Sequence, residues 1–199
     1  MMRFAIVVSL LVGFMVIGCA PSQEVNRVET DSQTDLSGKW NDTDARMVAQ
    51  DMTSDLLSAA WLQNEQKDRP VMIVGNIRNN TTEHIQTNIF IKEIERAVVN
   101  SQQIQIVADP EQREQIRAER TDQQQHASYE SASALAKELG ADYMLVGNID
   151  ANVDKNLDGT KAAKFYTVNL ELINVENNTK AWLGNKKIKK MIERNKVKW

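Results

Sequence analysis

Along most of this chain, segments in which apolar residues have the spacing of a β-strand alternate with segments in which they have the spacing of an α-helix. Over Val71–Ile77 apolar residues fill both alternating sets of positions, which is typical of a central strand buried on both faces. Helical spacing follows over 87–100, and a second short strand is expected over 104–107. The polar residues 78–82 predict a turn between the first strand and the helix. Together these segments form a βαβ unit with a right-handed crossover.

Three further helices are expected around this unit. Apolar residues at spacings of three to five predict a leading helix that ends near Leu62, with Asn41 or Asp42 as its N-cap. Asp109 and Pro110 begin a very polar helix that reaches about residue 125 and should be exposed, with a weak hold on the core. The third is expected to begin at Ser131 or Ser133 and to end at Leu139, before Gly140.

The last third of the chain predicts strands. Residues 142–149 have the pattern of a buried strand, and 150–161 predict a polar loop. Strict alternation over 165–175 predicts a half-buried strand. Its inward residues should be Tyr166, Val168, Leu170 and Leu172. A tight turn at Asn177-Asn178 leads to a lysine-rich strand over 180–189, which suits a sheet edge.

These elements define a mixed fold of the α/β class, with an α+β-like sheet of roughly five strands. The first three strands should be largely parallel, because helical crossovers connect them, and the last two should form an antiparallel meander. Helices should cover at least one face of the sheet.

Composition narrows the class of protein. The chain has 199 residues, a formal net charge of −3 and a pI near 5.5, which do not suggest a nucleic-acid binder. The basic run Lys186–Lys190 could contact anionic headgroups or an acidic partner, although a solvated edge strand explains it as well.

The amino-terminal residues predict export and lipidation. Arg3 precedes an apolar run over Phe4–Ile17, which fits the hydrophobic region of a signal peptide and is short for a membrane span. Gly18 precedes Cys19, the only cysteine of the chain, and this box resembles the lipobox of bacterial lipoproteins. That resemblance implies a diacylglyceryl group on the thiol of Cys19 and cleavage before it. The alternatives are an ordinary signal peptide or a marginal membrane anchor with a chance cysteine.

The expected domain organisation follows from this box. Residues 1–18 form the signal peptide, 19–39 contain the lipidated cysteine and a flexible polar tether, and 40–199 form a single globular domain. A tether of about 20 residues has an end-to-end distance of roughly 25 Å and a fully stretched length of about 70 Å.

No catalytic motif is present, so the sequence predicts a protein that is not an enzyme and uses no cofactor or metal. Neither a nucleophile elbow nor a zinc-protease motif occurs, and His84 and His126 lie far apart in the sequence. A calcium site is conceivable at Asp150, Asp154 and Asp158, which are spaced by four residues. Their spacing does not match the EF-hand pattern, and a solvated loop is the better interpretation.

The candidate binding residues lie after the first strand. Arg78, Asn79, Asn80 and His84 belong to a polar loop that we expect to be exposed, and we take them as candidate partner contacts. The alternative is a turn that caps the following helix, with His84 simply on the surface.

Five short motifs, in this order, are similar to the LpoB family. They are Leu36–Asp44, Val74–Asn79, Asp122–Gln124, Gly140–Gly147 and Leu170–Asn174. The resemblance covers essentially the whole mature chain and implies a fold like the amino-terminal domain of TolB. Family members are outer-membrane lipoproteins that activate penicillin-binding proteins without doing chemistry themselves.

The resemblance also implies a partner and a location. The partner would be a bifunctional (class A) penicillin-binding protein, with no nucleic acid or small-molecule substrate, and the lipid at Cys19 would hold the domain on the periplasmic side of the outer membrane. Ala20 after the cysteine agrees with outer-membrane sorting. Relatives have a long proline-rich linker, whereas this tether contains one proline, Pro21. The alternative function is a structural or assembly lipoprotein of an envelope or secretion complex, of the TolB-like or curli-channel-like kind.

Overall fold

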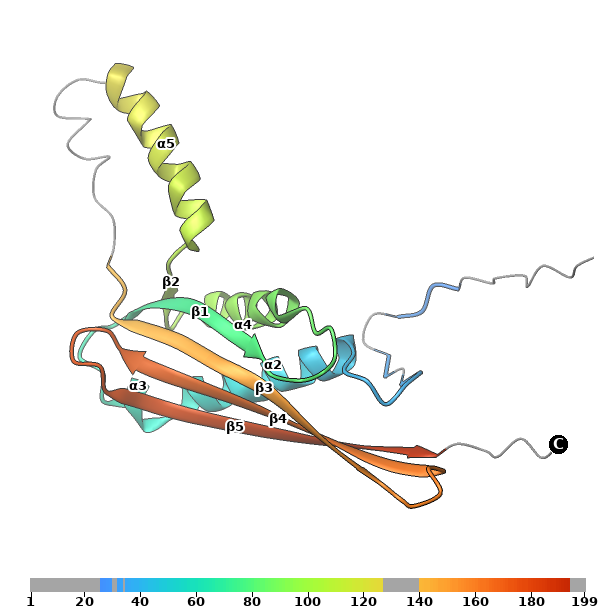
Figure 1. Cartoon of the computed structure of the whole chain (residues 1–199). Helices are drawn as coiled ribbons and strands as arrows, with labels where there is room; N and C mark the ends of the chain where they lie inside the picture. The colour runs from blue at the N-terminus through green and yellow to red at the C-terminus, as the bar shows by residue number, and fades with distance from the viewer. Residues whose placement is uncertain (1–25, 30–31, 34, 127–139, 194–199) are drawn as a thin grey trace, which may run out of the picture. The chain divides into compact units, whose positions relative to one another are not determined.

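The computed structural model describes residues 26–29, 32–33, 35–126 and 140–193 (Figure 1). The chain divides into two units, 1–32 and 33–199, and the second contains every described helix and strand. Cys19 and the helix expected over 131–139 lie outside the described residues.

Five strands form one mixed sheet in the order β2-β1-β3-β4-β5. Their bounds are β1 Val71–Asn79, β2 Gln105–Ile106, β3 Tyr143–Lys155, β4 Lys161–Asn174 and β5 Lys180–Glu193. β1 pairs in parallel with both β2 and β3, whereas β3, β4 and β5 pair antiparallel. The predicted combination of a parallel βαβ unit and an antiparallel meander is confirmed.

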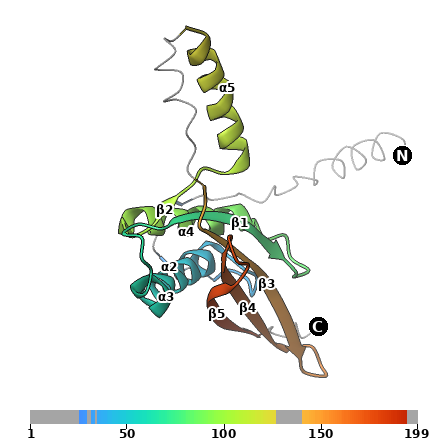
Figure 2. The same ribbon diagram turned by 90° about the vertical axis from the view of Figure 1, so that its left-hand side faces the viewer.

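Four helices accompany the sheet. They are α2 Asp42–Ser58, α3 Ala60–Gln63, α4 Thr87–Ser101 and α5 Pro110–His126. Helices α2 and α4 pack against each other and against the same face of the sheet (Figure 2). As predicted, Asp109 caps α5 by accepting a hydrogen bond from the Gln112 backbone N–H at 2.9 Å, and residues 111–120 are exposed or half-buried.

Helix α2 begins with a capping box and ends earlier than predicted. Asn41 Oδ1 accepts from the Asp44 N–H, and Asp44 Oδ2 accepts from the Asn41 N–H, both at 3.0 Å. Ala59 is extended, with a ψ of 152°, so the expected single helix to Leu62 is broken into α2 and α3. The Trp61 indole N–H donates to the Leu56 carbonyl at 2.9 Å, which satisfies a carbonyl at the end of α2.

The core lies between the sheet and the two packed helices. The four predicted inward side chains of β4 are all at most 2% exposed, and they meet apolar side chains from α2 and α4. The helix side chains of this core are Val48, Ala49, Met52, Leu56, Phe90, Ile94 and Val98. Trp40 closes one end, where its ring makes edge contacts with Phe90 and Tyr166 at centroid distances of 6.4 and 5.5 Å. Full burial of each such side chain contributes about 1.5–3 kcal/mol.

Two sequence predictions about the strands are wrong. The loop expected over 150–161 is mostly strand: β3 runs to Lys155 and β4 begins at Lys161, with only a tight turn between them. This hairpin end was not predicted because both of its faces are exposed over 152–159, so no burial pattern marks it. β1 also reaches Asn79, and it is not covered on both faces, since Asn76 and Arg78 are exposed.

Candidate functional site

The sheet face opposite α2 and α4, called the open face here, is polar at its centre. One row of side chains crosses four strands, because Arg78 pairs with Asn148, Asn148 with Asn169 and Asn169 with Asn185 in the strand register. Arg78 and Asn185 are exposed, and the two central asparagines are half-buried. We call these four residues the polar row.

One carboxylate fixes the amides of this row. Asp150 on β3 accepts hydrogen bonds from Asn148 and from Asn169, the latter at 3.5 Å. It also accepts from the Asn80 amide at 2.9 Å, while Asn185 donates to Asn169 at 2.6 Å. Since each amide is held by a neighbour, the polar row has a defined shape before any partner binds, which lowers the entropic cost of binding.

A hollow of about 290 Å³ lies at the Arg78 end of the polar row. Its lining residues are Asn76, Arg78, Val146, Gly147, Asn148 and Glu171. The register of β1 against β3 shifts between Val74 and Ile77, so the Gly75-Asn76 pair forms a bulge beside the hollow. A Cβ on Gly147 would collide with the Asn169 carbonyl, which explains the glycine at this position.

Paired cations occur on both faces of the sheet, since on the open face Lys180 pairs with Glu171 and Lys161 with Glu193. Lys164, Lys186 and Lys190 lie on the helix side and pair with carboxylates. Arg78, Lys187 and Lys189, on the open face, have no carboxylate partner among the residues that the structure describes. The open face therefore presents three cations without a described carboxylate partner, beside the Asp150 carboxylate that the amides hold.

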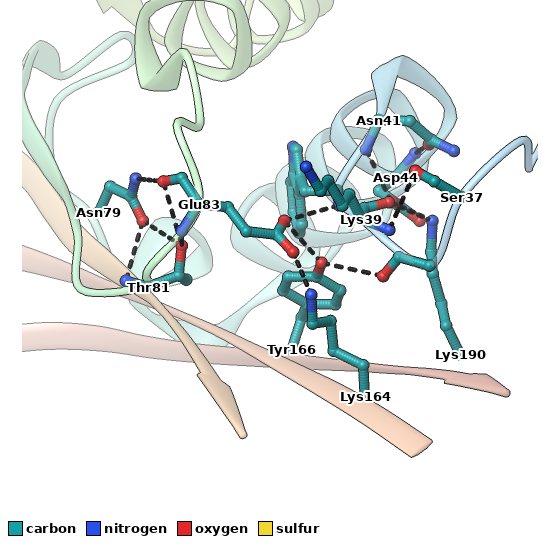
Figure 3. Close-up of polar contacts among 12 residues, drawn as sticks. Ser37, Lys39, Asn41, Asp44, Asn79, Thr81, Glu83, Lys164, Tyr166 and Lys190 are labelled. Carbon is teal, nitrogen blue, oxygen red and sulfur yellow. Dashed lines mark hydrogen bonds and ion pairs between the residues drawn. The ribbon is translucent and has the colours of Figure 1, made fainter. Parts of the chain in front are cut away.

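The four residues predicted after β1 do not form one patch. Arg78 belongs to the polar row, and Asn80 is linked to it through Asp150. Asn79 accepts from the Thr81 N–H at 3.0 Å and donates to the Glu83 carbonyl at 2.7 Å, so it shapes the turn (Figure 3). His84 is exposed and its Nε2 lies 2.7 Å from the Gln86 amide. A contact role for Asn79 and His84 stays a prediction.

A second polar cluster, buried at the helix side, was not predicted. Glu83 receives the Lys164 ammonium, the Tyr166 hydroxyl at 2.8 Å and the Trp40 backbone N–H at 3.0 Å (Figure 3). Burial by itself would raise the pKa of Glu83, but these three donors outweigh it and hold the pKa below its ordinary value. Burial and the adjacent Glu83 charge raise the pKa of Tyr166, which stays protonated.

Lys190 ties the chain entering the domain to β5. Its ammonium lies 2.6 Å from Asp44 Oδ2 and 2.7 Å from Asp35 Oδ1, and it donates to the Lys39 carbonyl at 3.0 Å. The Lys190 side chain is 9% exposed and that of Asp44 is 5% exposed. Burial would lower the pKa of Lys190, yet hydrogen bonds to the two carboxylates raise it overall. The sequence does contain one indication of this contact. Side chains of a strand alternate between the two faces of the sheet, so Lys186 and Lys190 must lie on one face and Lys187 on the other.

Within the described ranges, no three acidic, histidine or cysteine side chains are close enough to hold a metal ion. Asp150 is occupied by amides, and Asp158 accepts from Thr160 in the β3–β4 turn. None of the helices in the described part of the chain has the length and apolar character that a membrane crossing requires.

Fold and surface together define a small mixed α/β domain in which the sheet face opposite α2 and α4 is polar at its centre. Residues 44–188 match the family model described as "Peptidoglycan-synthase activator LpoB", and the chain belongs to this family. The resemblance found in the sequence motifs is thus confirmed.

Solved structures of LpoB proteins are similar to this chain. The C-terminal domain from Salmonella enterica is 18% identical, with 73% of this chain and 98% of that chain covered and a TM-score of 0.44. The C-terminal domain from Escherichia coli has the same identity and coverage, with a TM-score of 0.45. An NMR structure of E. coli LpoB is 17% identical and covers 88% of this chain and 87% of its own, with a TM-score of 0.44. No curated protein sequence matches significantly.

Proposed function

We propose that this chain is a non-enzymatic lipoprotein that binds and activates a bifunctional (class A) penicillin-binding protein and thereby regulates peptidoglycan synthesis. The observation that carries the proposal is the match of residues 44–188 to a family of peptidoglycan-synthase activators. An activator of this kind stimulates its synthase only by binding the active state more tightly than the inactive one.

The open face is the surface that we assign to the synthase. Its polar row is held in place by Asp150, and its hollow can receive one side chain of a partner. Arg78, Lys187 and Lys189 supply positive charge without a carboxylate partner in the described part of the chain, so the matching surface of the synthase should be acidic. Arg78 is the one predicted contact residue that the fold places directly in this row.

Anchoring is the second part of the proposal and rests on the sequence alone. Cys19, followed by Ala20, would carry the lipid and hold the domain at the outer membrane, facing the periplasm. More than one acyl chain is needed for stable anchoring, which the lipoprotein pathway provides.

The binding surface is tested by charge reversal. Arg78→Glu and Lys187→Glu should each weaken binding of the purified synthase about tenfold at low salt, and less at high salt, because solvent screens these charges. Arg69→Glu is the matched control, since Arg69 is exposed just before β1 and outside the open face. Equal losses for Arg78→Glu and Arg69→Glu would contradict the assignment of the open face.

A pull-down with crosslinking separates the two functions considered from the sequence. Recovery of a class A synthase from envelope extracts, lost in Arg78→Glu, is the expected result. Recovery of outer-membrane channel components without any synthase would instead indicate an assembly lipoprotein.

A further inference from the structure

The β3–β4 hairpin end of the sheet combines exposed apolar side chains with cations. Leu157, in the turn, is fully exposed, and the exposed fractions of Val153, Phe165 and Met191 are 43%, 38% and 62%. Lys155 is exposed and has no carboxylate partner among the described residues. We call the residues 153–165 together with Met191 the hairpin end.

Other charges at this end are already balanced or partly so. Lys161 pairs with Glu193 at 3.1 Å, and Lys189 lies 5.0 Å from the centre of the Phe165 ring. Asp158 is held by Thr160, and Asp154 is the remaining exposed acid. Lys155 and Lys189 are matched by Asp154 and Asp158, so the hairpin end has no net charge beside its apolar tip.

The chain also enters the domain at this end. Asp35 and the Lys39 carbonyl are bound by Lys190, which pairs with Lys164 in the register of β4 and β5. Lys164 is three residues from the start of β4 at Lys161, so this contact lies about 10 Å from the hairpin turn at 3.4 Å per residue. Asp35 is therefore docked beside the hairpin end.

We infer that the hairpin end rests on the lipid bilayer to which the chain is anchored. The inference depends on the proposed lipid at Cys19, from which only residues 20–34 separate the docked Asp35. A random coil of 15 residues would span about 20 Å and would give the hairpin end a millimolar effective concentration at the membrane surface. Weak contacts then suffice: an exposed leucine inserts at the headgroup boundary, and lysines meet anionic phospholipid.

This arrangement gives the open face a fixed direction relative to the membrane. The polar row begins at Arg78 and crosses the sheet, whereas the hairpin end lies beyond it along β3 and β4. A domain standing on its hairpin end leaves the polar row free at the side, accessible to a synthase. A short tether would then be enough to present the binding surface.

Vesicle binding tests the inference without the lipid anchor or a synthase. A chain from Gln33 to Trp199 includes all described helices and strands and contains no cysteine. Leu157→Cys in this chain can be labelled with the environment-sensitive dye NBD. On vesicles of phosphatidylethanolamine and phosphatidylglycerol we expect a blue shift and higher intensity. A similar change is expected on phosphatidylcholine alone, because the hairpin end has no net charge and its apolar tip makes the contact. The same label at Gln50→Cys, on the exposed side of α2, should not respond.

Partition of unlabelled variants gives the second readout. Leu157→Ser and Lys155→Gln should each lower binding to the anionic vesicles about fivefold. Val99→Ser and Arg69→Gln are the matched controls, since both side chains are exposed away from the hairpin end, and they should bind like the parent chain. An unresponsive label at position 157, or equal losses in the controls, would overturn the inference. Neither outcome would affect the synthase-binding proposal, because no synthase is present.

Discussion

Lys190 gives the sharpest prediction about what holds the domain together. Replacement by Met keeps most of the apolar stem but removes the ammonium between Asp44 and Asp35. The Asp44 carboxylate, 5% exposed, would then lose the ammonium and keep the hydrogen bond from the Asn41 N–H. Leaving a buried charge without its partner costs about 3–5 kcal/mol, and the exposed Asp35 contact adds less than about 1 kcal/mol.

Lys190→Met should therefore lower the free energy of unfolding by about 3 kcal/mol. In a domain of this size that corresponds to a fall in Tm of roughly 6–12 °C. Urea and thermal unfolding followed by circular dichroism measure both quantities. Lys187→Met is the control on the same strand, and it should change stability by less than about 0.5 kcal/mol because Lys187 is exposed on the open face.

A double-mutant cycle with Asp44→Asn tests the cause. The double variant should be more stable than the sum of the two single changes predicts, because a neutral amide no longer needs the ammonium. The reasoning is refuted if Lys190→Met and Lys187→Met have equal stability, or if the cycle shows no coupling.

Three other predictions concern acid stability, packing and anchoring. Because the pKa of Glu83 is held below 4.5, the ionised carboxylate stabilises the fold above about pH 4.5, and this stabilisation is lost as the pH falls through the lowered pKa. Glu83→Gln should therefore make the free energy of unfolding, measured with urea, less dependent on pH in the acid range. Gly147→Ala should cost about 2 kcal/mol, since the added methyl meets the Asn169 carbonyl, whereas Gly140→Ala, with nothing near, should be neutral in the same assay. Cys19→Ala should move the protein from the membrane to the soluble fraction of cells; continued membrane partition would argue against lipidation.

The sheet could be predicted from the sequence where burial leaves a periodic mark. β4 alternates strictly because one of its sides faces the helices, and its four inward side chains are all in the core. No such alternation marks the hairpin end, because residues 152–159 are exposed on both faces of the sheet and polar residues occur at positions facing either side. A strand without a buried face carries no hydrophobic signature.

The binding surface could be predicted only in part, for a different reason. Arg78 could be predicted as a contact residue because it follows a strongly apolar strand. The other three residues of the polar row could not, because their positions beside Arg78 depend on the register of β3, β4 and β5. Likewise, the lysines of β5 suggested a solvated edge, yet Lys190 is buried against Asp44, which is far away in the sequence. Contacts between distant segments of a sheet protein are set by register, which local patterns do not reveal.

The most direct test of the account is the rate of glycan polymerisation by a class A synthase from the same organism. Adding the chain without its lipid should raise this rate, and Arg78→Glu should require a higher concentration for the same effect, while Arg69→Glu should act like the parent protein. No change in rate at concentrations that saturate binding, with any class A synthase of that organism, would contradict the proposed function.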